Sequence, residues 1–192
     1  MFIVIDGIDG CGKSTQVKLL ANLLAKRGID FVTSKWKDSQ YVEKLFIGDL
    51  LKRFQDGSVR IPPEARTFLL AADISNRLSS TIKPALSSGK VVIGDRYIYK
   101  IVAQGIARGL ERRWLENLFT FAVEPDVKFF LDLDPEVAAD RILSYREISY
   151  YEAGCDILDG QDRRRNFVKF QSKVRENLLM IAKEIGGVII DA

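Results

Sequence analysis

The sequence contains no histidine and only two cysteines, Cys11 and Cys155, in 192 residues. Because histidine is the side chain that titrates near neutral pH, catalysis by an imidazole acid or base is excluded. A zinc site built from histidine and cysteine is excluded as well. Two cysteines are also too few for the disulfide framework of a small secreted domain. We therefore expect reduced thiols and a cytoplasmic location.

Long apolar runs and a strong net charge are also missing. No apolar stretch approaches the ~18 residues that indicate a membrane-spanning helix, so we expect no membrane partner. The 29 basic and 26 acidic residues leave a net charge of only +3. Nucleic-acid-binding domains concentrate their basic residues on one face, whereas the dense basic cluster here covers only residues 163–165. We therefore expect no nucleic-acid partner.

The sequence does contain a phosphate-binding motif directly after a short apolar segment. Residues 2–6 (FIVID) predict a buried strand, residues 7–15 (GIDGCGKST) match the pattern G-x-x-x-x-G-K-S, and an amphipathic helix follows at once. This order of strand, glycine-rich loop and helix is the context that a P-loop requires. Its inward-pointing N–H groups and the helix N-terminus bind the phosphates of a nucleoside triphosphate. The expected cofactor-binding residues are Gly7, Asp9, Gly10, Cys11, Gly12, Lys13, Ser14 and Thr15.

Two P-loop side chains have expected roles in phosphoryl transfer. Lys13 is placed to reach the β- and γ-phosphates, and the Ser14 hydroxyl is placed to bind Mg²⁺. Asp95 follows the apolar strand that we predict over residues 91–93. That is the position from which a carboxylate supports the same metal ion, so we expect Ser14 and Asp95 at the metal site and Asp95 among the catalytic residues.

Strands and helices alternate along the rest of the chain. This alternation predicts an α/β fold of the P-loop NTPase type, a five-stranded parallel sheet flanked by helices on both faces. The active-site loops should then gather at the carboxyl edge of the sheet. Besides residues 2–6, we predict strands at 29–33, 91–93, 127–131 and 188–190. We predict helices at 13–26, 41–54, 62–82 (ended or bent by Pro84), 101–107, 112–121, 135–143 (N-capped by Asp134) and 163–185.

We expect one domain over residues 1–192, with a mobile flap at about residues 144–162. This segment is polar and contains Gly154 and Gly160. A P-loop kinase has to exclude water from the transferring phosphoryl group, and a closing flap that carries arginines both excludes water and neutralises charge. The Asn-Lys-x-Asp motif that GTPase switches usually carry is absent from the sequence. A kinase is therefore favoured over a switch.

The sequence resembles the thymidylate kinase family over nearly its whole length. The resemblance is carried by the P-loop and by the segments FLLAAD (68–73), IKPAL (82–86), GDRY (94–97) and FQSKVR (170–175). The segments DRYIY (95–99) and EAGCDI (152–157) are most similar to archaeal members. The resemblance implies that the chain uses ATP and Mg²⁺ to phosphorylate dTMP to dTDP, and that it forms a homodimer. Two alternatives stay open: a kinase for another nucleotide or deoxynucleoside, and a catalytically weak P-loop nucleotide-binding paralogue.

The resemblance also implies roles for residues around the phosphates. Asp9 is implied to bind the deoxyribose 3′-hydroxyl, and Arg96 to contact both the acceptor phosphate and the transferring phosphoryl group. Lys35 or Lys37 stands near the position of a phosphate-binding arginine after the second strand.

An arginine of the P-loop itself is missing. Some family members have an arginine where this chain has Gly10; in the other branch of the family that arginine comes from the flap. Arg146 is therefore a candidate catalytic residue, and Arg141 a candidate ATP contact. The alternative for Arg141 is an ion pair with Glu136 or Asp140 on its own helix.

The base pocket departs most from the family pattern. Leu70 and Ile74 stand where the family usually has an aromatic residue and an arginine that hold the thymine. We expect Arg77, one turn further along the helix, to read the base instead, with Phe68 or Trp36 nearby. The alternative is that Arg77 pairs with Asp73 on a solvated face. Where the family often has a serine and then Ala-Tyr-Gln, this chain has Lys100 and Ala103-Gln104. The expected acceptor-binding residues are Asp9, Lys35, Trp36, Phe68, Arg77, Arg96, Lys100 and Gln104.

Overall fold

The computed structural model describes residues 1–35, 53, 56–160 and 162–192, which build a parallel sheet. The strand order is β2-β3-β1-β4-β5, and all neighbouring strands pair in parallel. The predicted five-stranded parallel sheet is thereby confirmed. The strands are β1 (Phe2–Gly7), β2 (Phe31–Lys35), β3 (Val91–Asp95), β4 (Val127–Asp132) and β5 (Val188–Asp191).

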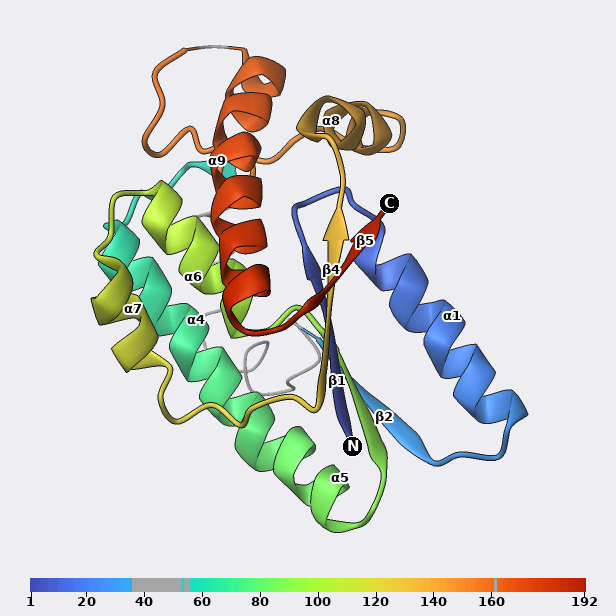
Figure 1. Cartoon of the computed structure of the whole chain (residues 1–192). Coiled ribbons are helices and arrows are strands. Elements are labelled where there is room, and N and C mark those ends of the chain that lie inside the picture. The colour runs from blue at the N-terminus through green and yellow to red at the C-terminus, as the bar shows by residue number, and fades with distance from the viewer. Residues whose placement is uncertain (36–52, 54–55, 161) are drawn as a thin grey trace.

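Helices cover both faces of this sheet (Figure 1). Helix α1 lies on one side, and α6 packs with α9 on the other. Central strand β1 is buried along its whole length because it is flanked by β3 and β4 and covered on both faces. The helices are α1 (Lys13–Lys26), α4 (Pro63–Arg77), α5 (Lys83–Ser87), α6 (Ile98–Ala107), α7 (Arg112–Leu118), α8 (Pro135–Leu143) and α9 (Arg163–Glu184), with a π-helical segment η1 (Leu78–Ile82) between α4 and α5.

Several predicted boundaries are wrong by two or three residues. Strand β2 begins at Phe31 rather than Ile29, because pairing with β3 aligns Phe31 with Val91. Helix α6 begins at Ile98 and not at Ile101, and α7 ends at Leu118. These limits depend on partners that are distant in the sequence. The predicted helix at 41–54 lies outside the described residues, except for Arg53.

Pro84 does not end the helix that begins at Pro63. The helical path continues through η1 into α5 and ends at Ser87. Proline has no N–H to donate within a helix and crowds the preceding turn. Here it occupies the first turn of α5, where a missing N–H is tolerated, and the preceding turn is widened to a π-helix.

The predicted flap packs against α6 and α9. Ile148, Tyr151 and Ala153 are buried. Arg108 is the C-cap residue of α6. Its buried guanidinium binds both carboxylate oxygens of Asp156, at 2.7 and 3.2 Å, and lies 4.4 Å from the ring centroid of Phe170 in α9. The base of the flap is therefore anchored to two helices. Movement of the flap stays a prediction.

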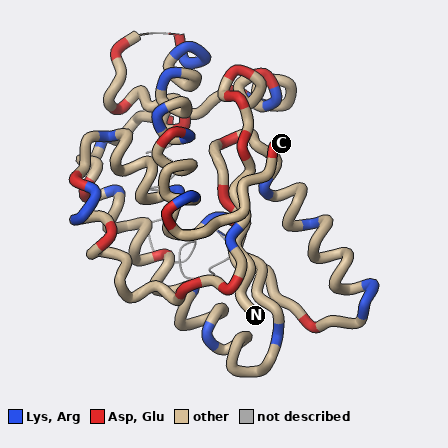
Figure 2. Tube along the Cα trace, in the orientation of Figure 1, with Lys and Arg blue, Asp and Glu red and all other residues tan. Residues whose placement is uncertain are grey.

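Basic and acidic residues are interspersed along the described chain (Figure 2). The basic cluster at residues 163–165 begins α9, close to acidic residues of α8. Within it, Arg164 lies 2.8 Å from carboxylate oxygens of both Glu136 and Asp140. In the described part of the chain, none of the helices is both long and apolar enough to cross a membrane.

The Arg108–Asp156 pair gives a test of flap anchoring. We expect Asp156→Ala to lower the free energy of unfolding by about 3–5 kcal/mol, because it leaves the Arg108 charge buried without its partner. Asp140→Ala removes an exposed ion pair between α8 and α9 and should cost less than about 1 kcal/mol. Denaturant unfolding of both variants measures the difference. Equal small losses would mean that Asp156 does not hold the flap.

Candidate active site

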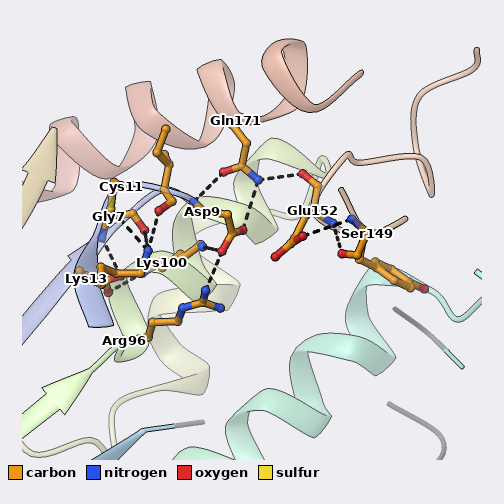
Figure 3. A network of polar contacts seen from close by, with 12 residues as sticks. Gly7, Asp9, Cys11, Lys13, Arg96, Lys100, Ser149, Glu152 and Gln171 are labelled. Carbon is orange, nitrogen blue, oxygen red and sulfur yellow. Dashed lines mark hydrogen bonds and ion pairs between the residues drawn. The ribbon is translucent and has the colours of Figure 1, made fainter. Parts of the chain in front are cut away.

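The P-loop joins β1 to α1 and encloses its own lysine. Gly12, with φ of 93°, is the N-cap residue of α1. The buried Lys13 Nζ donates to the carbonyl oxygens of Gly7 and Ile8, at 3.0 and 2.5 Å, and lies 3.5 Å from Cys11 Sγ (Figure 3). The ammonium group is thus held at the centre of the loop by weak neutral acceptors, which phosphate oxygens can replace.

Gly10 is required because the loop passes very close to α8. Its φ is 83°, and a Cβ atom there would lie 2.7 Å from the carbonyl oxygen of Ala138. Any side chain at this position, including arginine, would force α8 to move. This contact explains in physical terms why the P-loop carries no arginine.

Ser14 and Asp95 meet at the start of α1 and the end of β3. Ser14 Oγ donates to Asp95 Oδ2 over 2.7 Å. The other oxygen, Oδ1, is buried and has no hydrogen-bond partner among the described residues. A hydroxyl and a carboxylate beside the phosphate loop are the oxygen ligands that Mg²⁺ uses, together with water and phosphate. The described residues contain no cluster of three or more acidic or cysteine side chains that would bind a metal without phosphate.

Asp9 lies at the centre of a buried cluster of cations (Figure 3). Its Oδ1 is 2.7 Å from Arg96 Nη2 and 2.6 Å from Lys100 Nζ. Burial disfavours the charged carboxylate, but Lys100, Arg96 and Lys13 outweigh burial and hold the pKa of Asp9 well below its ordinary value. Burial and the charge of Arg96 lower the pKa of Lys100 to about 7, against the opposing effect of Asp9. The fold thus gathers three cationic side chains around one carboxylate.

Arg96 has a strained backbone. Its φ is 66°, the only positive value at a non-glycine position in the described ranges. Its N–H donates to Ile5 and its carbonyl accepts from Arg77 Nη2 over 3.0 Å. Because 43% of the side chain is exposed, the guanidinium is accessible to a ligand. A strained backbone of this kind persists only where surrounding contacts hold it in place, as these two hydrogen bonds do for Arg96.

Arg77 is buried, so the alternative of a solvated face is wrong, although the ion pair with Asp73 in that alternative is present. Only 3% of the residue is exposed. Its Nε donates to Ser34 Oγ and its Nη2 to the Ser34 carbonyl, at 2.9 and 2.7 Å, whereas Asp73 lies 3.8 Å away. Arg77 therefore ties α4 to the end of β2 and to Arg96.

Two further carboxylates near strand ends, Asp6 and Asp132, have structural partners. Asp6 is fully buried and accepts from the N–H groups of Gly7, Tyr97 and Lys100, which joins β1 to the start of α6. Asp132 binds the guanidinium of Arg175 in α9 at 2.5 and 2.8 Å.

A cavity of about 590 Å³ lies beside this cluster. It brings together half of the predicted site residues, and most of the others belong to the P-loop. Its floor is apolar, with Leu70, Ile74 and Ile101, and the flap contributes Arg146 and Tyr151. The predicted residues that line it are Asp9, Ser14, Lys35, Arg77, Asp95, Arg96, Lys100, Gln104 and Arg146.

Two predicted site residues lie elsewhere, and a third is outside the described residues. Phe68 is 52% exposed and packs edge-on against Trp114 of α7, with ring centroids 5.6 Å apart. Its position on α4 turns it away from Leu70 and Ile74, so it does not line the cavity. Arg141 is exposed and also absent from the lining, and its predicted partners Glu136 and Asp140 bind Arg164 instead. Trp36 is not among the described residues.

The sequence interpretation missed two residues. Arg66 lines the cavity, with its guanidinium carbon 5.3 Å from the ring centroid of Tyr151. The spacing 66, 70, 74 places it on the cavity face of α4 and could have revealed it. Gln171 of α9 contacts Asp9, and its signal is a lone amide within an apolar helix face.

Known proteins match this chain along most of its length. A family model described as thymidylate kinase matches residues 5–192. A probable thymidylate kinase of Thermococcus kodakarensis is 40% identical over 186 residues, covering 95% of this chain and 84% of that protein. A probable thymidylate kinase 2 of Saccharolobus solfataricus is 34% identical, covering 98% and 86%. A thymidylate kinase of Halothermothrix orenii is 31% identical, covering 100% and 88%. On this evidence the chain belongs to the thymidylate kinase family.

Proposed function

We propose that this chain transfers the γ-phosphoryl group of ATP to dTMP and produces dTDP and ADP. The observation that carries the proposal is the Asp9–Arg96–Lys100 cluster, which stands between the P-loop and the cavity. A P-loop alone would suit any nucleoside triphosphatase. A cation cluster that joins the P-loop to an adjoining, partly apolar cavity suits an acceptor that carries both a phosphate and a base.

The donor side uses the P-loop. Its N–H groups and the N-terminus of α1 hold the phosphates of ATP. Lys13 exchanges the carbonyls of Gly7 and Ile8 for β- and γ-phosphate oxygens, which are stronger acceptors. Ser14 and Asp95 would hold Mg²⁺, because their oxygens meet and Asp95 Oδ1 lacks another partner among the described residues. When bound, Mg²⁺ neutralises charge on the β- and γ-phosphates.

The acceptor side uses the cavity. Arg96 and Lys35 bind the phosphate of dTMP, and Arg146 approaches from the flap. The Asp9 carboxylate accepts a hydrogen bond from the 3′-hydroxyl of dTMP and, at the same time, orients Arg96 through their ion pair. Phosphoryl transfer needs little covalent participation of the protein, so catalysis comes from holding both phosphates in line and from neutralising their charge.

The base occupies the apolar part of the cavity, and Gln104 reads it. Two nitrogens of Arg77 already donate three hydrogen bonds to Ser34 and Arg96, which favours a positioning role for that residue. Gln104 lines the same cavity from α6. Its amide offers one acceptor and two donors, a match for the N–H and a neighbouring carbonyl of thymine.

The working protein is proposed to be a cytoplasmic homodimer. Both cysteines are free thiols, and Cys11 lies inside the P-loop, which suits a reducing compartment. Phe68 and Trp114 form an apolar pair at the surface of α4 and α7, the kind of feature through which helices pack in dimers. Light scattering on the purified protein measures its mass.

The proposed reaction is tested by ADP release with ATP, Mg²⁺ and each nucleoside monophosphate in turn. We expect dTMP to stimulate release most strongly. Strongest stimulation by a different nucleotide would mean that this nucleotide, and not dTMP, is the acceptor. Absence of stimulation by every acceptor would favour a binding protein, an alternative that the comparisons with known proteins do not support.

Lys13→Ala should lower kcat by about 100- to 1,000-fold, the usual effect of removing one group that stabilises transition-state charge. The fold should persist, because the hydrogen bonds that Lys13 makes with described residues all lie within its own loop. Lys18→Ala, an exposed position on the same helix, is the control and should retain parental kinetics. Loss of cooperative unfolding in Lys13→Ala would instead identify Lys13 as a structural residue.

Asp9→Asn should raise the KM for dTMP by about 10- to 100-fold, which corresponds to the ~1.5–3 kcal/mol of a hydrogen bond to a charged group. The KM for ATP should change much less. A second measurement uses the parent protein with 3′-deoxy-dTMP, which should be a poor acceptor. Equal use of dTMP and its 3′-deoxy analogue would contradict the role given to Asp9.

The two candidates for base reading are separated by Gln104→Leu and Arg77→Ala. We expect Gln104→Leu to cost about 1–3 kcal/mol in kcat/KM for dTMP, the penalty for an unpaired buried polar group, with little change for ATP. We expect Arg77→Ala to lower kcat and thermal stability together. Loss of dTMP affinity alone in Arg77→Ala, with parental kinetics in Gln104→Leu, would return base reading to Arg77.

A further inference from the structure

Gln171 is a buried amide in α9 that contacts two functional segments at once (Figure 3). None of its surface is exposed. Its Nε2 donates to the backbone carbonyl of Glu152 in the flap over 2.8 Å, and to Asp9 Oδ2 in the P-loop over 3.4 Å. Its Oε1 accepts the N–H of Asp9 over 3.4 Å.

These partners set the orientation of the amide and use all of its donors. The carbonyl of Glu152 and the carboxylate of Asp9 accept hydrogen bonds, whereas the Asp9 N–H donates one, so nitrogen and oxygen cannot exchange places. Both hydrogens of Nε2 are engaged. Gln171 therefore has no donor left for a nucleotide, and its role must be exerted through Asp9 and Glu152.

Each partner of Gln171 holds an arginine of the active site. The Glu152 carboxylate binds both terminal nitrogens of Arg146 at 2.8 Å. Asp9 binds Arg96 at 2.7 Å. One amide thus stands between the arginine of the flap and the arginine beside the P-loop. A rigid helix supports it, because neighbouring Phe170 packs under Gly154 and Arg108.

We propose that Gln171 is a positioning residue that couples the P-loop to the flap, so that Asp9 and Arg146 are held in register for phosphoryl transfer. The proposal rests on the proposed function, in which Asp9 and Arg146 serve the acceptor. If the coupling exists, a nucleotide bound in the P-loop stabilises the docked flap. Without the Gln171 amide, nucleotide binding should no longer affect docking of the flap. By linkage, flap docking then favours nucleotide binding by the same factor.

Asn166 provides a matched control. It is a second buried amide on α9, and it also contacts the segment that includes the flap: its Nδ2 donates to the Gly160 carbonyl and to Cys155 Sγ, at 3.3 and 3.6 Å. Among the described residues, its side chain makes no hydrogen bond to the P-loop. Asn166→Leu therefore reports the effect of loosening the flap alone, and Gln171→Met, which preserves side-chain length, reports the loss of the link.

The experiment combines steady-state kinetics with amide hydrogen exchange of residues 146–158, with and without Mg²⁺ and a non-hydrolysable ATP analogue. We expect the analogue to slow exchange in the parent and in Asn166→Leu, but not in Gln171→Met, although that variant still binds the analogue. We expect Gln171→Met to lower kcat by about 10- to 100-fold, the scale of a misplaced reacting group, with KM for ATP little changed. Asn166→Leu should keep kcat within a few fold.

Two results would overturn the coupling. One is flap exchange in the parent that does not respond to the analogue, a measurement that needs no variant and applies even if Gln171→Met does not fold. The other is Gln171→Met with parental kcat and a parental exchange response. Absence of dTMP turnover in the parent would contradict the proposed function instead, and the exchange measurement would still decide the coupling.

Discussion

The carboxylate of Asp9 is the charge around which the site is arranged. A buried carboxylate beside a phosphate-binding loop is costly unless it is compensated. Arg96, Lys100 and the Gln171 amide all provide compensation. Each compensating group constrains its own element in turn: Lys100 is buried with its ammonium against Asp9, and Arg96 adopts a left-handed backbone. The arrangement leaves Arg96 partly exposed to the cavity while Lys100 stays inside.

The framework that holds these charges is itself polar. Asp6 collects three backbone N–H groups and so fastens the end of β1 to the start of α6. Arg77 bridges α4, the end of β2 and the carbonyl of Arg96. Both residues lie at the carboxyl edge of the sheet, where parallel strands end and backbone groups would otherwise lack partners. Residues that pattern analysis would assign to catalysis thus serve to position the catalytic ones.

The sequence predicted best what local signals determine. Helix α8 begins and ends where expected, because Pro135 opens it and Asp134 caps it by accepting from Glu136 N–H at 2.7 Å. The P-loop residues and Arg96 belong to contiguous motifs, so their meeting could be foreseen. The limits of β2 and α6 could not be foreseen, because they depend on pairing with β3 and on packing with α9, which are distant in the sequence. Phe68 was misplaced because a shift of two residues on a helix turns a side chain by more than half a turn.

The flap divides into a strongly held part and a weakly held part. Breaking the buried Arg108–Asp156 pair would leave a desolvated charge and cost roughly 3–5 kcal/mol. The Arg146–Glu152 pair is much more exposed, and such pairs contribute at most about 1 kcal/mol. Any opening that admits nucleotides should therefore separate the segment around Arg146 from the cavity and leave Asp156 docked on α6. Gln171 contacts Glu152 within the weakly held part. Because few other contacts hold this part, one hydrogen bond to a rigid helix there has a large influence on the orientation of Arg146.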